Sequence, residues 1–222
     1  MEGFLFYTPL VIEYILESNP DDRILFRASE ILRKGGVVAF PTETNWVIAG
    51  SPYIQSSVDK IYRLRHIENT KHLTIMVPDF KSAMEIAAID DHAFALLKKV
   101  VPGSYTFIFE AHKKITKYLK ASKIDHQVGI RFPPKKLCQA LLKAHGDVLL
   151  TSHINHQMLE EEDESIPLYS AQLEDYFGGK IDMILDPGEF EFLGSTTVVD
   201  FISGEPEVIR EGLGSPKFFI RN

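Results

Sequence analysis

Short runs of apolar residues recur along this chain and alternate with segments whose apolar residues have helical spacing. A strand that is apolar throughout is expected to be covered on both faces of its sheet, whereas a half-exposed strand alternates apolar and polar residues. The runs that read as strands are GVVAF, LTIMV, YTFIFEA, QVGIRF, DVLLTSHI, IDMILD, STTVVDFI and PEVIRE. We therefore expect a sheet that carries helices on both of its faces.

The segments between these runs have the spacing of amphipathic helices. We predict helices over 23–34, 58–65, 113–120, 137–145 and 167–177, and a helical region over 81–100 that breaks near Asp90 and Asp91. Several strands follow one another near the end of the chain, which indicates a mixed sheet. No repeat or linker divides the 222 residues, of which 45% are hydrophobic and 25% charged. The predicted fold class is therefore α/β (α+β), as a single three-layer domain over residues 1–222 with a mixed, twisted β-sheet.

Three features restrict the environment in which the protein works. Cys138 is the single cysteine of the sequence, so an internal disulfide and a cysteine-rich zinc site are excluded. The first residues are apolar but include Glu2 and Glu13 and lack a basic start, which is not typical of a signal peptide. No run of about 18 apolar residues is present, so we predict no membrane segment. We expect a cytoplasmic protein.

Charge is strongly segregated along a chain whose net charge is −7. Residues 98–143 contain 11 basic and 2 acidic residues, whereas residues 144–207 contain 15 acidic residues and one base. The basic segment is either the solvated face of a helix over 113–120 or a patch that contacts RNA phosphates. The acidic run 160–164 is expected to be an exposed loop.

Polar residues that suit anion binding follow several of the predicted strands. The segment PTET places Thr44 just beyond a strand, where open α/β sheets bind ligands, and the alternative is that PTET is simply a turn. Arg65 ends the apolar stripe of the next helix and either extends its charge to solvent or holds an anion. Arg131 lies in the apolar strand VGIRFP, so it requires either an acidic partner from residues 144–207 or an anionic ligand.

The later strands add hydroxyl groups and a further arginine. The strand DVLLTSHI contributes Ser152, STTVVD contributes Thr196 and VIREG contributes Arg210. His153 and His156 have a spacing seen in metal sites, but no third ligand is defined and we predict no metal site. Walker A, GxGxxG and GxSxG patterns are absent from the sequence. This set favours charge stabilisation over covalent catalysis, and it includes no catalytic nucleophile.

At these residues, from about 27 to 214, the chain resembles the YrdC/YciO family of threonylcarbamoyl-AMP synthase-like proteins. GGVVAFPTET is similar to the family's GGVVAYPTET, VGIRFP to VGxRxP, and STTVVD with VIREG to STVVD and LRxG. KIYRLR, LTIMV, VPGSYTFIF and LLTS are similar to further family segments in the same order. The resemblance implies a YrdC/RibB-like fold with a large positively charged cleft.

The resemblance also implies a reaction. Bicarbonate and L-threonine form a carbamate that attacks the α-phosphate of ATP, which enters with Mg²⁺, and pyrophosphate leaves. The product, L-threonylcarbamoyladenylate, serves tRNA modification. Matched motif by motif, Thr44, Arg131 and Thr196 are implied to bind the amino-acid substrate. Arg65, Ser152 and Arg210 are implied to bind the nucleotide.

Six departures from the family pattern resemble those of the YciO branch, and two of them are Arg65 in place of a lysine and His72 in place of a proline. Ile67 replaces an arginine, Ile154 an asparagine, Met76 a histidine and Val47 a glycine. Because the lost groups are polar or charged, we expect synthase activity that is weak or altered. A non-catalytic protein that binds double-stranded RNA is the alternative. A third interpretation is an enzyme that acts on another carbamoyl or acyl phosphate.

Overall fold

Strands and helices alternate along the chain, as the apolar pattern predicts. The computed structural model describes residues 11–66, 72–159 and 167–220. Its strands are β1 (Val11–Tyr14), β2 (Val37–Pro41), β3 (Trp46–Gly50), β4 (Thr74–Met76), β5 (Tyr105–Glu110), β6 (Gln127–Arg131), β7 (Leu149–Ile154), β8 (Met183–Asp186), β9 (Thr197–Asp200) and β10 (Glu207–Arg210). Its helices are α1 (Asp22–Arg33), α2 (Gln55–Leu64), α3 (Phe80–Ile86), α4 (Asp91–Leu97), α5 (Lys113–Thr116), α6 (Lys120–Asp125), α7 (Lys136–His145) and α8 (Ser170–Phe177). Three short 3-10 helices are η1 (His156–Leu159), η2 (Gly178–Lys180) and η3 (Pro216–Phe218).

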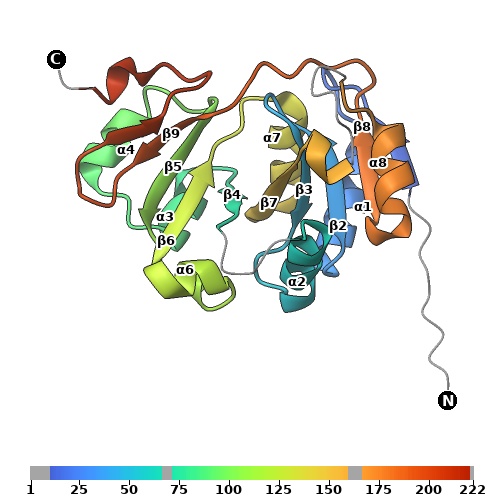
Figure 1. Ribbon diagram of the computed structural model, residues 1–222, viewed down its shortest axis with the longest axis horizontal. Coiled ribbons are helices and arrows are strands. Elements are labelled where there is room, and N and C mark those ends of the chain that lie inside the picture. Colours follow the sequence, from blue (N-terminus) through green and yellow to red (C-terminus); the bar gives the residue numbers. More distant parts are fainter. Residues whose placement is uncertain (1–10, 67–71, 160–166, 221–222) are drawn as a thin grey trace.

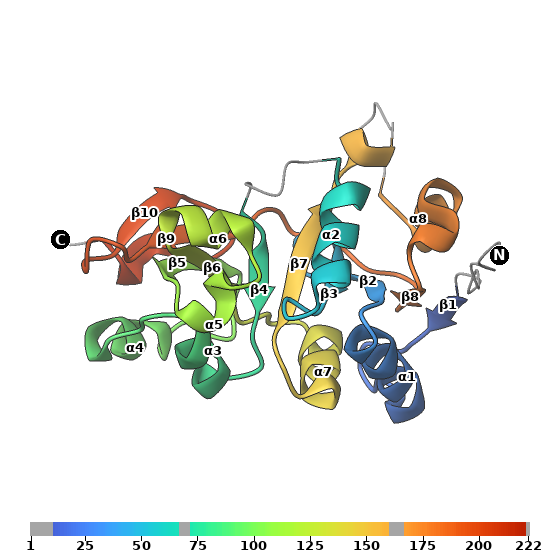
Figure 2. The same cartoon turned by 90° about the horizontal axis from the view of Figure 1, so that it is seen from below.

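These strands form one mixed sheet in the order β1-β8-β2-β3-β7-β4-β6-β5-β9-β10. The pairs β1–β8, β8–β2, β4–β6 and β5–β9 are parallel, and the other neighbours are antiparallel. The sheet is strongly twisted, and its two ends carry separate groups of helices (Figures 1 and 2). The predicted α/β class with a mixed, twisted sheet is confirmed.

Central strands send alternate side chains into two apolar clusters, one on each face of the sheet. In β2, Val37 and Ala39 belong to the larger cluster, and Val38 and Phe40 belong to the smaller one. Helices α2 and α8 cover the larger cluster, and α1 and α7 cover the smaller one from the opposite side (Figure 2). Burial on both faces explains why these strands are apolar without interruption.

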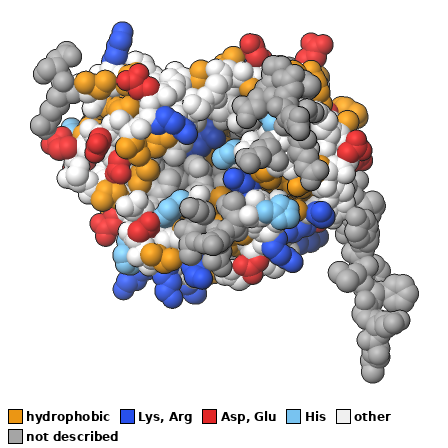
Figure 3. Space-filling view, viewed as in Figure 1, with side chains coloured by type: hydrophobic (Ala, Val, Ile, Leu, Met, Phe, Trp, Pro, Cys, Tyr) orange, Lys and Arg blue, Asp and Glu red, His pale blue; other side chains and the backbone are white. Residues whose placement is uncertain are grey.

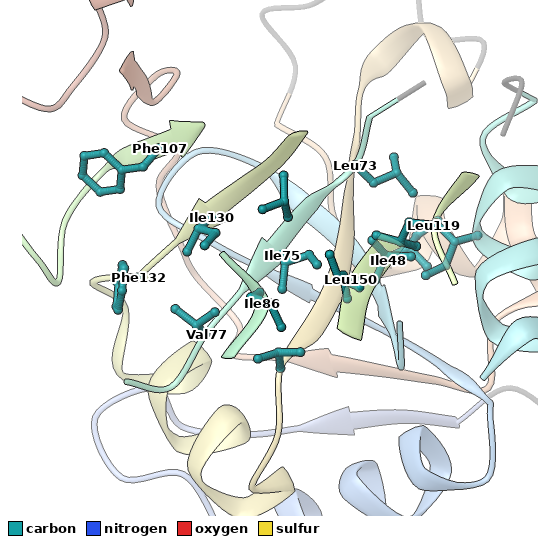
Figure 4. Close-up of a cluster of buried hydrophobic side chains, with 14 of the residues drawn as sticks. Ile48, Leu73, Ile75, Val77, Ile86, Phe107, Leu119, Ile130, Phe132 and Leu150 are labelled. Carbon is teal, nitrogen blue, oxygen red and sulfur yellow. The ribbon is translucent and has the colours of Figure 1, made fainter. Parts of the chain in front are cut away.

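In the half of the sheet formed by β4, β6, β5 and β9, the smaller cluster reaches Met76 of β4, whereas the larger cluster continues through all four strands. It runs from Ile48 through Ile75 and Ile130 to Phe107 (Figure 4). On the opposite face of this half, Thr106 and Val198 are only half-buried. Helices α1 and α7 lie against the other half (Figure 2), and Thr106 and Val198 on this face line a cavity.

Two strands were not predicted from the sequence. β1 lies at the start of the described chain, and β3 forms a hairpin with β2 in which Pro41 faces Trp46. The turn is closed by a hydrogen bond from the Thr42 backbone N–H to the Asn45 carbonyl, at 2.8 Å. PTET therefore does not simply end a strand, because it forms the tip of a hairpin.

The helix expected over 113–120 is confirmed only over Lys113–Thr116, and it does not continue to residue 120. Leu119 has extended backbone angles (φ −99°, ψ 113°) and separates α5 from α6. Its side chain is buried beside that of Ile115, so the break directs both residues into the core. The predicted break near Asp90 is confirmed, because the Asp90 carboxylate accepts from the backbone N–H of Ala93 at 2.7 Å and begins α4. The start of the helix predicted from residue 167 lies instead at Ser170.

Replacing Phe107 by alanine should destabilise the protein strongly. The ring is fully buried and contacts those of Tyr105, Phe201 and Phe219. Removing a buried aromatic ring leaves a cavity, so we expect Phe107→Ala to lower the free energy of unfolding by about 4 kcal/mol. Urea unfolding followed by circular dichroism measures this change. The control is Phe26→Ala, at an exposed ring on α1, which should change stability by less than about 1 kcal/mol; equal effects would contradict the assigned core.

Candidate functional site

A cavity of about 570 Å³ lies between the two halves of the sheet. It is lined by the β2–β3 turn, the end of α2, the start of β4, the strands β5, β6, β7 and β9, and the end of β10. All six residues singled out in the sequence line it, namely Thr44, Arg65, Arg131, Ser152, Thr196 and Arg210. The structure thus brings together side chains that are far apart in the chain, although their assigned ligands remain predictions.

The β2–β3 turn holds Thr44 in a fixed position. The Thr42 hydroxyl donates to the Asn45 carbonyl at 2.8 Å and accepts from the backbone N–H groups of Thr44 and Asn45 at 3.2 and 3.1 Å. The Thr44 hydroxyl lies 3.1 Å from the Thr42 hydroxyl. Either hydroxyl can be the donor in this contact, and the Thr44 hydroxyl can both donate and accept a hydrogen bond.

A buried ion pair joins this turn to the opposite half of the sheet. Arg131 Nη2 of β6 donates to Glu43 Oε1 at 2.5 Å, and the two side chains are only 8% and 4% exposed. Glu43 Oε2 and Arg131 Nε are buried and have no hydrogen-bond partner within the described structure. The expectation that an acid from residues 144–207 pairs with Arg131 is wrong. The partner is Glu43, which the β2–β3 hairpin places in contact with Arg131.

Arg65 is the C-cap residue of α2, and its side chain reaches the cavity. Its Nη1 donates to the hydroxyl of Ser152 on β7, and its Nε is buried without a hydrogen-bond partner in the described residues. Burial lowers the pKa of the Arg65 guanidinium. The partner is a neutral hydroxyl, so the positive charge of Arg65 is not offset by this contact. The side chain therefore lines the cavity rather than extending into solvent.

Arg210 is tied to the opposite rim. Its Nε and Nη2 donate to the Thr196 carbonyl at 3.2 and 3.0 Å, and Nη2 also contacts the Thr196 hydroxyl at 3.1 Å. The Thr106 and Thr196 hydroxyls lie 3.0 Å apart. Gly212 packs so closely on the Ser195 and Thr196 backbone that a β-carbon there would clash. The segment after β10 thus requires glycine at this point.

His153 was not assigned to the cavity from the sequence, yet it lines the cavity beside Ser152. Its side chain is partly exposed to solvent, and three arginines of the cavity lie near it. Burial, and then the charges of Arg65, Arg210 and Arg131, lower the pKa of His153 to about 4. The imidazole is therefore neutral at pH 7, when it can both donate and accept a hydrogen bond.

The cavity is positively charged. Three arginines line it, and none of its described lining residues is an aspartate or glutamate. Lys or Arg side chains and His side chains are visible in the hollow between the two halves (Figure 3). Apart from the Arg131–Glu43 pair, the described contacts of these arginines are to hydroxyls and carbonyls. The site is suited to an anionic small molecule.

Comparisons with known proteins decide the family. The Sua5/YciO/YrdC family model, described as "Telomere recombination", matches residues 30–212. The chain belongs to the Sua5/YciO/YrdC family. The uncharacterized protein YciO of Escherichia coli K12 is 33% identical over 211 residues, which cover 93% of this chain and 98% of that protein. The crystal structure of E. coli YciO matches with a TM-score of 0.79 at 27% identity, covering 96% of this chain and all of the other.

A more distant relative in the Sua5/YciO/YrdC family has a named activity. The threonylcarbamoyl-AMP synthase of Pyrococcus abyssi is 24% identical over 186 residues, which cover 83% of this chain and 53% of that protein. The crystal structure of P. abyssi Sua5 complexed with L-threonine matches with a TM-score of 0.76 at 22% identity, covering 92% of this chain and 57% of the other. That likeness shows the shared fold.

The departures from the family pattern fall in different environments. Val47 lines the cavity. Ile154 and Met76 are fully buried, in the larger and smaller apolar clusters respectively, and neither lines it. Ile67 lies outside the described residues. The residue after Ile154 is an asparagine, Asn155, but the Oδ1 atom of its side chain accepts a hydrogen bond from the backbone N–H of Met158 at 3.0 Å.

Part of the positive charge of the basic segment 98–143 is offset by acidic side chains. Lys114 pairs with Glu85, and Lys135 pairs with Glu17. RNA binding there stays a prediction. The acidic run 160–164 lies outside the described residues.

Within the part of the chain that is described, no three His, Cys, Asp or Glu side chains are grouped to hold a metal ion, and no helix is long and apolar enough to cross a membrane.

Removing the charge of Glu43 should destabilise the fold. In Glu43→Gln, Arg131 stays buried without an anionic partner, and we expect the free energy of unfolding to fall by about 3 kcal/mol. Urea unfolding measures it. Glu30→Gln is the matched control, because Glu30 pairs with Arg33 at the surface and should contribute less than about 0.5 kcal/mol. If both variants lose equally little, the buried pair does not hold the two halves together.

The pKa of His153 should report anion binding. We expect an NMR titration midpoint of about 4 for its ring in the free protein and a higher midpoint in sulfate, because a bound anion offsets the three guanidinium charges. The unfolded chain has the ordinary pKa of 6.5, so this residue's contribution to folding stability falls as pH drops from 6.5 towards 4. His153→Gln identifies the signal. A midpoint near 6.5 that sulfate does not move would contradict the assigned cavity.

Proposed function

We propose that this protein binds ATP and L-threonine in the cavity and forms L-threonylcarbamoyladenylate. In the proposed reaction, the threonine amino group and bicarbonate form a carbamate with loss of water. A carbamate oxygen then attacks the α-phosphorus of ATP, the bond to the β-phosphate oxygen breaks, and pyrophosphate leaves. The product would supply the modification of adenosine in tRNA.

One observation carries this proposal: three arginines from separate parts of the chain converge on a cavity without a described acidic lining residue. Adenylyl transfer needs little from a protein beyond the positioning of two anions and the stabilisation of charge on the phosphates. Fixed donors in a walled cavity stabilise such charge more strongly than water does, because they need no reorganisation. Relationship to a named threonylcarbamoyl-AMP synthase supports the choice of reaction.

The amino-acid end of the proposed site contains Thr44, Arg131 and Thr196. Glu43 holds one Nη of Arg131, and Arg131 lines the cavity with donors that this ion pair does not use. A substrate carboxylate would take these donors. The Thr44 hydroxyl, which can donate or accept, would hydrogen-bond the substrate's amino or hydroxyl group.

The nucleotide end of the proposed site contains Arg65, Ser152 and Arg210. The Arg65–Ser152 contact holds one guanidinium at the cavity, and the Arg210–Thr196 contacts hold a second one there. These two cations would stabilise the charge on the α-phosphate and on the departing pyrophosphate. Mg²⁺ would enter with ATP and keep phosphate and water ligands, since the described lining residues offer it hydroxyls but no carboxylate.

The proposed chemistry requires no protein nucleophile. Cys138, the single cysteine, is fully buried against the Pro41 carbonyl, and burial raises the pKa of its thiol to about 12. A thiol in this state does not react as a nucleophile at neutral pH. Adenylyl transfer directly between the two substrates is therefore consistent with the residues that line the cavity.

Pyrophosphate release from ATP should depend on both L-threonine and bicarbonate. We expect slow turnover, followed by pyrophosphate detection and by chromatography of the adenylate, with no product when either co-substrate is omitted. Arg65→Ala should lower the rate about 10- to 100-fold, because a hydrogen bond to a charged group is lost. The control is Arg23→Ala, whose side chain is 90% exposed on α1 and which should turn over like the unmodified protein. Turnover no faster than a blank at high protein concentration would reject the proposed reaction.

A further inference from the structure

A second cavity, of about 380 Å³, lies between the ends of α2 and α8. Both helices cover the same face of the sheet (Figure 2). Leu64 and Phe177 are buried and form an apolar floor, and the half-buried ring of Tyr176 forms a wall. Tyr176 packs edge-on against Phe177, with ring centroids 4.9 Å apart. These residues offer a flat ligand an apolar and aromatic surface.

Basic side chains surround this floor. Lys60, Arg63, His66 and Lys180 line the same cavity, and none of its described lining residues is acidic. Lys60 is neutralised by Asp182, with Nζ and Oδ2 2.6 Å apart. Among the described residues, Arg63 donates only to the Asp59 backbone carbonyl, at 3.4 Å, and no described carboxylate forms an ion pair with Arg63 or Lys180. Two positive charges at the rim thus lack a described acidic partner.

His66 occupies a backbone conformation that glycine adopts more easily. Its φ is 50°, and it follows Arg65, the C-cap residue of α2. Helices commonly end in this left-handed conformation, and glycine is the usual residue there because it has no β-carbon. A histidine at this position keeps an imidazole at the cavity at a cost in backbone energy, which favours a role for the side chain.

We propose that this cavity binds a nucleoside monophosphate, with the base against Tyr176 and the apolar floor and the phosphate against Arg63 and Lys180. A flat base stacks on aromatic rings, and guanidinium and ammonium groups bind phosphate oxygens. The volume falls within the range of small-ligand cavities. The site does not depend on the synthase reaction. Cations at the ends of α2 and α8 also offset the partial negative charge of the last carbonyls, and that role alone would produce no saturable binding.

Two histidines distinguish the cavities experimentally, because His66 lines this one and His153 lines the larger one. AMP is added to the protein carrying Arg210→Glu, which weakens anion binding in the larger cavity, and the two imidazole signals are followed by NMR. We expect AMP to shift the His66 signal along a saturable curve that Arg210→Glu leaves unchanged. A shift confined to His153, or one lost in the Arg210→Glu protein, would overturn the proposal.

Side-chain variants test the two halves of the ligand. Arg63→Ser and Lys180→Ser should each weaken the binding of both AMP and inorganic phosphate about 10-fold. Tyr176→Leu should weaken AMP about 10-fold and leave inorganic phosphate unchanged, because only AMP has a base to stack. Lys34→Ser, at an exposed lysine outside the cavity, is the charge control. Equal AMP affinity in all four variants would reject the site.

A final pair of variants separates ligand binding from backbone strain. His126 also has a left-handed φ, of 58°, at the end of α6, and it lines neither cavity. His66→Gly and His126→Gly should both raise the melting temperature by relieving the backbone. Only His66→Gly should weaken AMP binding. If both glycine variants bind AMP as the unmodified protein does, the imidazole has no role in binding.

Discussion

The buried pair between Glu43 and Arg131 connects the two halves of the molecule at the point where the cavity forms. Burying two charges costs several kcal/mol each, and this cost is recovered only if the partners meet in good geometry. The pair therefore couples the tip of the β2–β3 hairpin to the end of β6. It also leaves a polar atom of each partner unsatisfied, which an apolar core would not tolerate but a ligand site can use.

Unequal coverage of the sheet explains why a cavity exists here. Helices α1 and α7 pack on the strands of one half, whereas on the same face of β5 and β9 the half-buried Thr106 and Val198 line the cavity. The apolar runs predicted the strands and the mixed sheet because burial on both faces leaves a clear pattern. The strand from Trp46 to Gly50 has the same apolar character but was missed, because recognising it depends on a four-residue turn closed by Thr42 and not on composition.

The six cavity residues could be found from the sequence because hydroxyls and arginines follow apolar strands, and because family motifs mark them. Other parts of the site could not. The charge pattern predicts a partner for Arg131 in the acidic segment 144–207, because a charge count cannot show that the β2–β3 hairpin brings Glu43 into contact with Arg131. His153 resembled half of a metal site, and its place among three arginines depends on strand order. Long-range register carries this information, and local patterns do not.

The replacements that separate this chain from the family's synthase pattern differ in their physical consequences. Ile154 and Met76 are packed in the two apolar clusters, so they stabilise the walls of the cavity without touching a ligand in it. Val47 is different, because it lines the cavity and adds volume where the family pattern has glycine. The positive charge of Arg65 and Arg210 is retained, and electrostatic attraction of an anion requires only that charge. Precise alignment of an attacking carbamate requires shape as well, so the described replacements would affect the rate of transfer more than the binding of an anion.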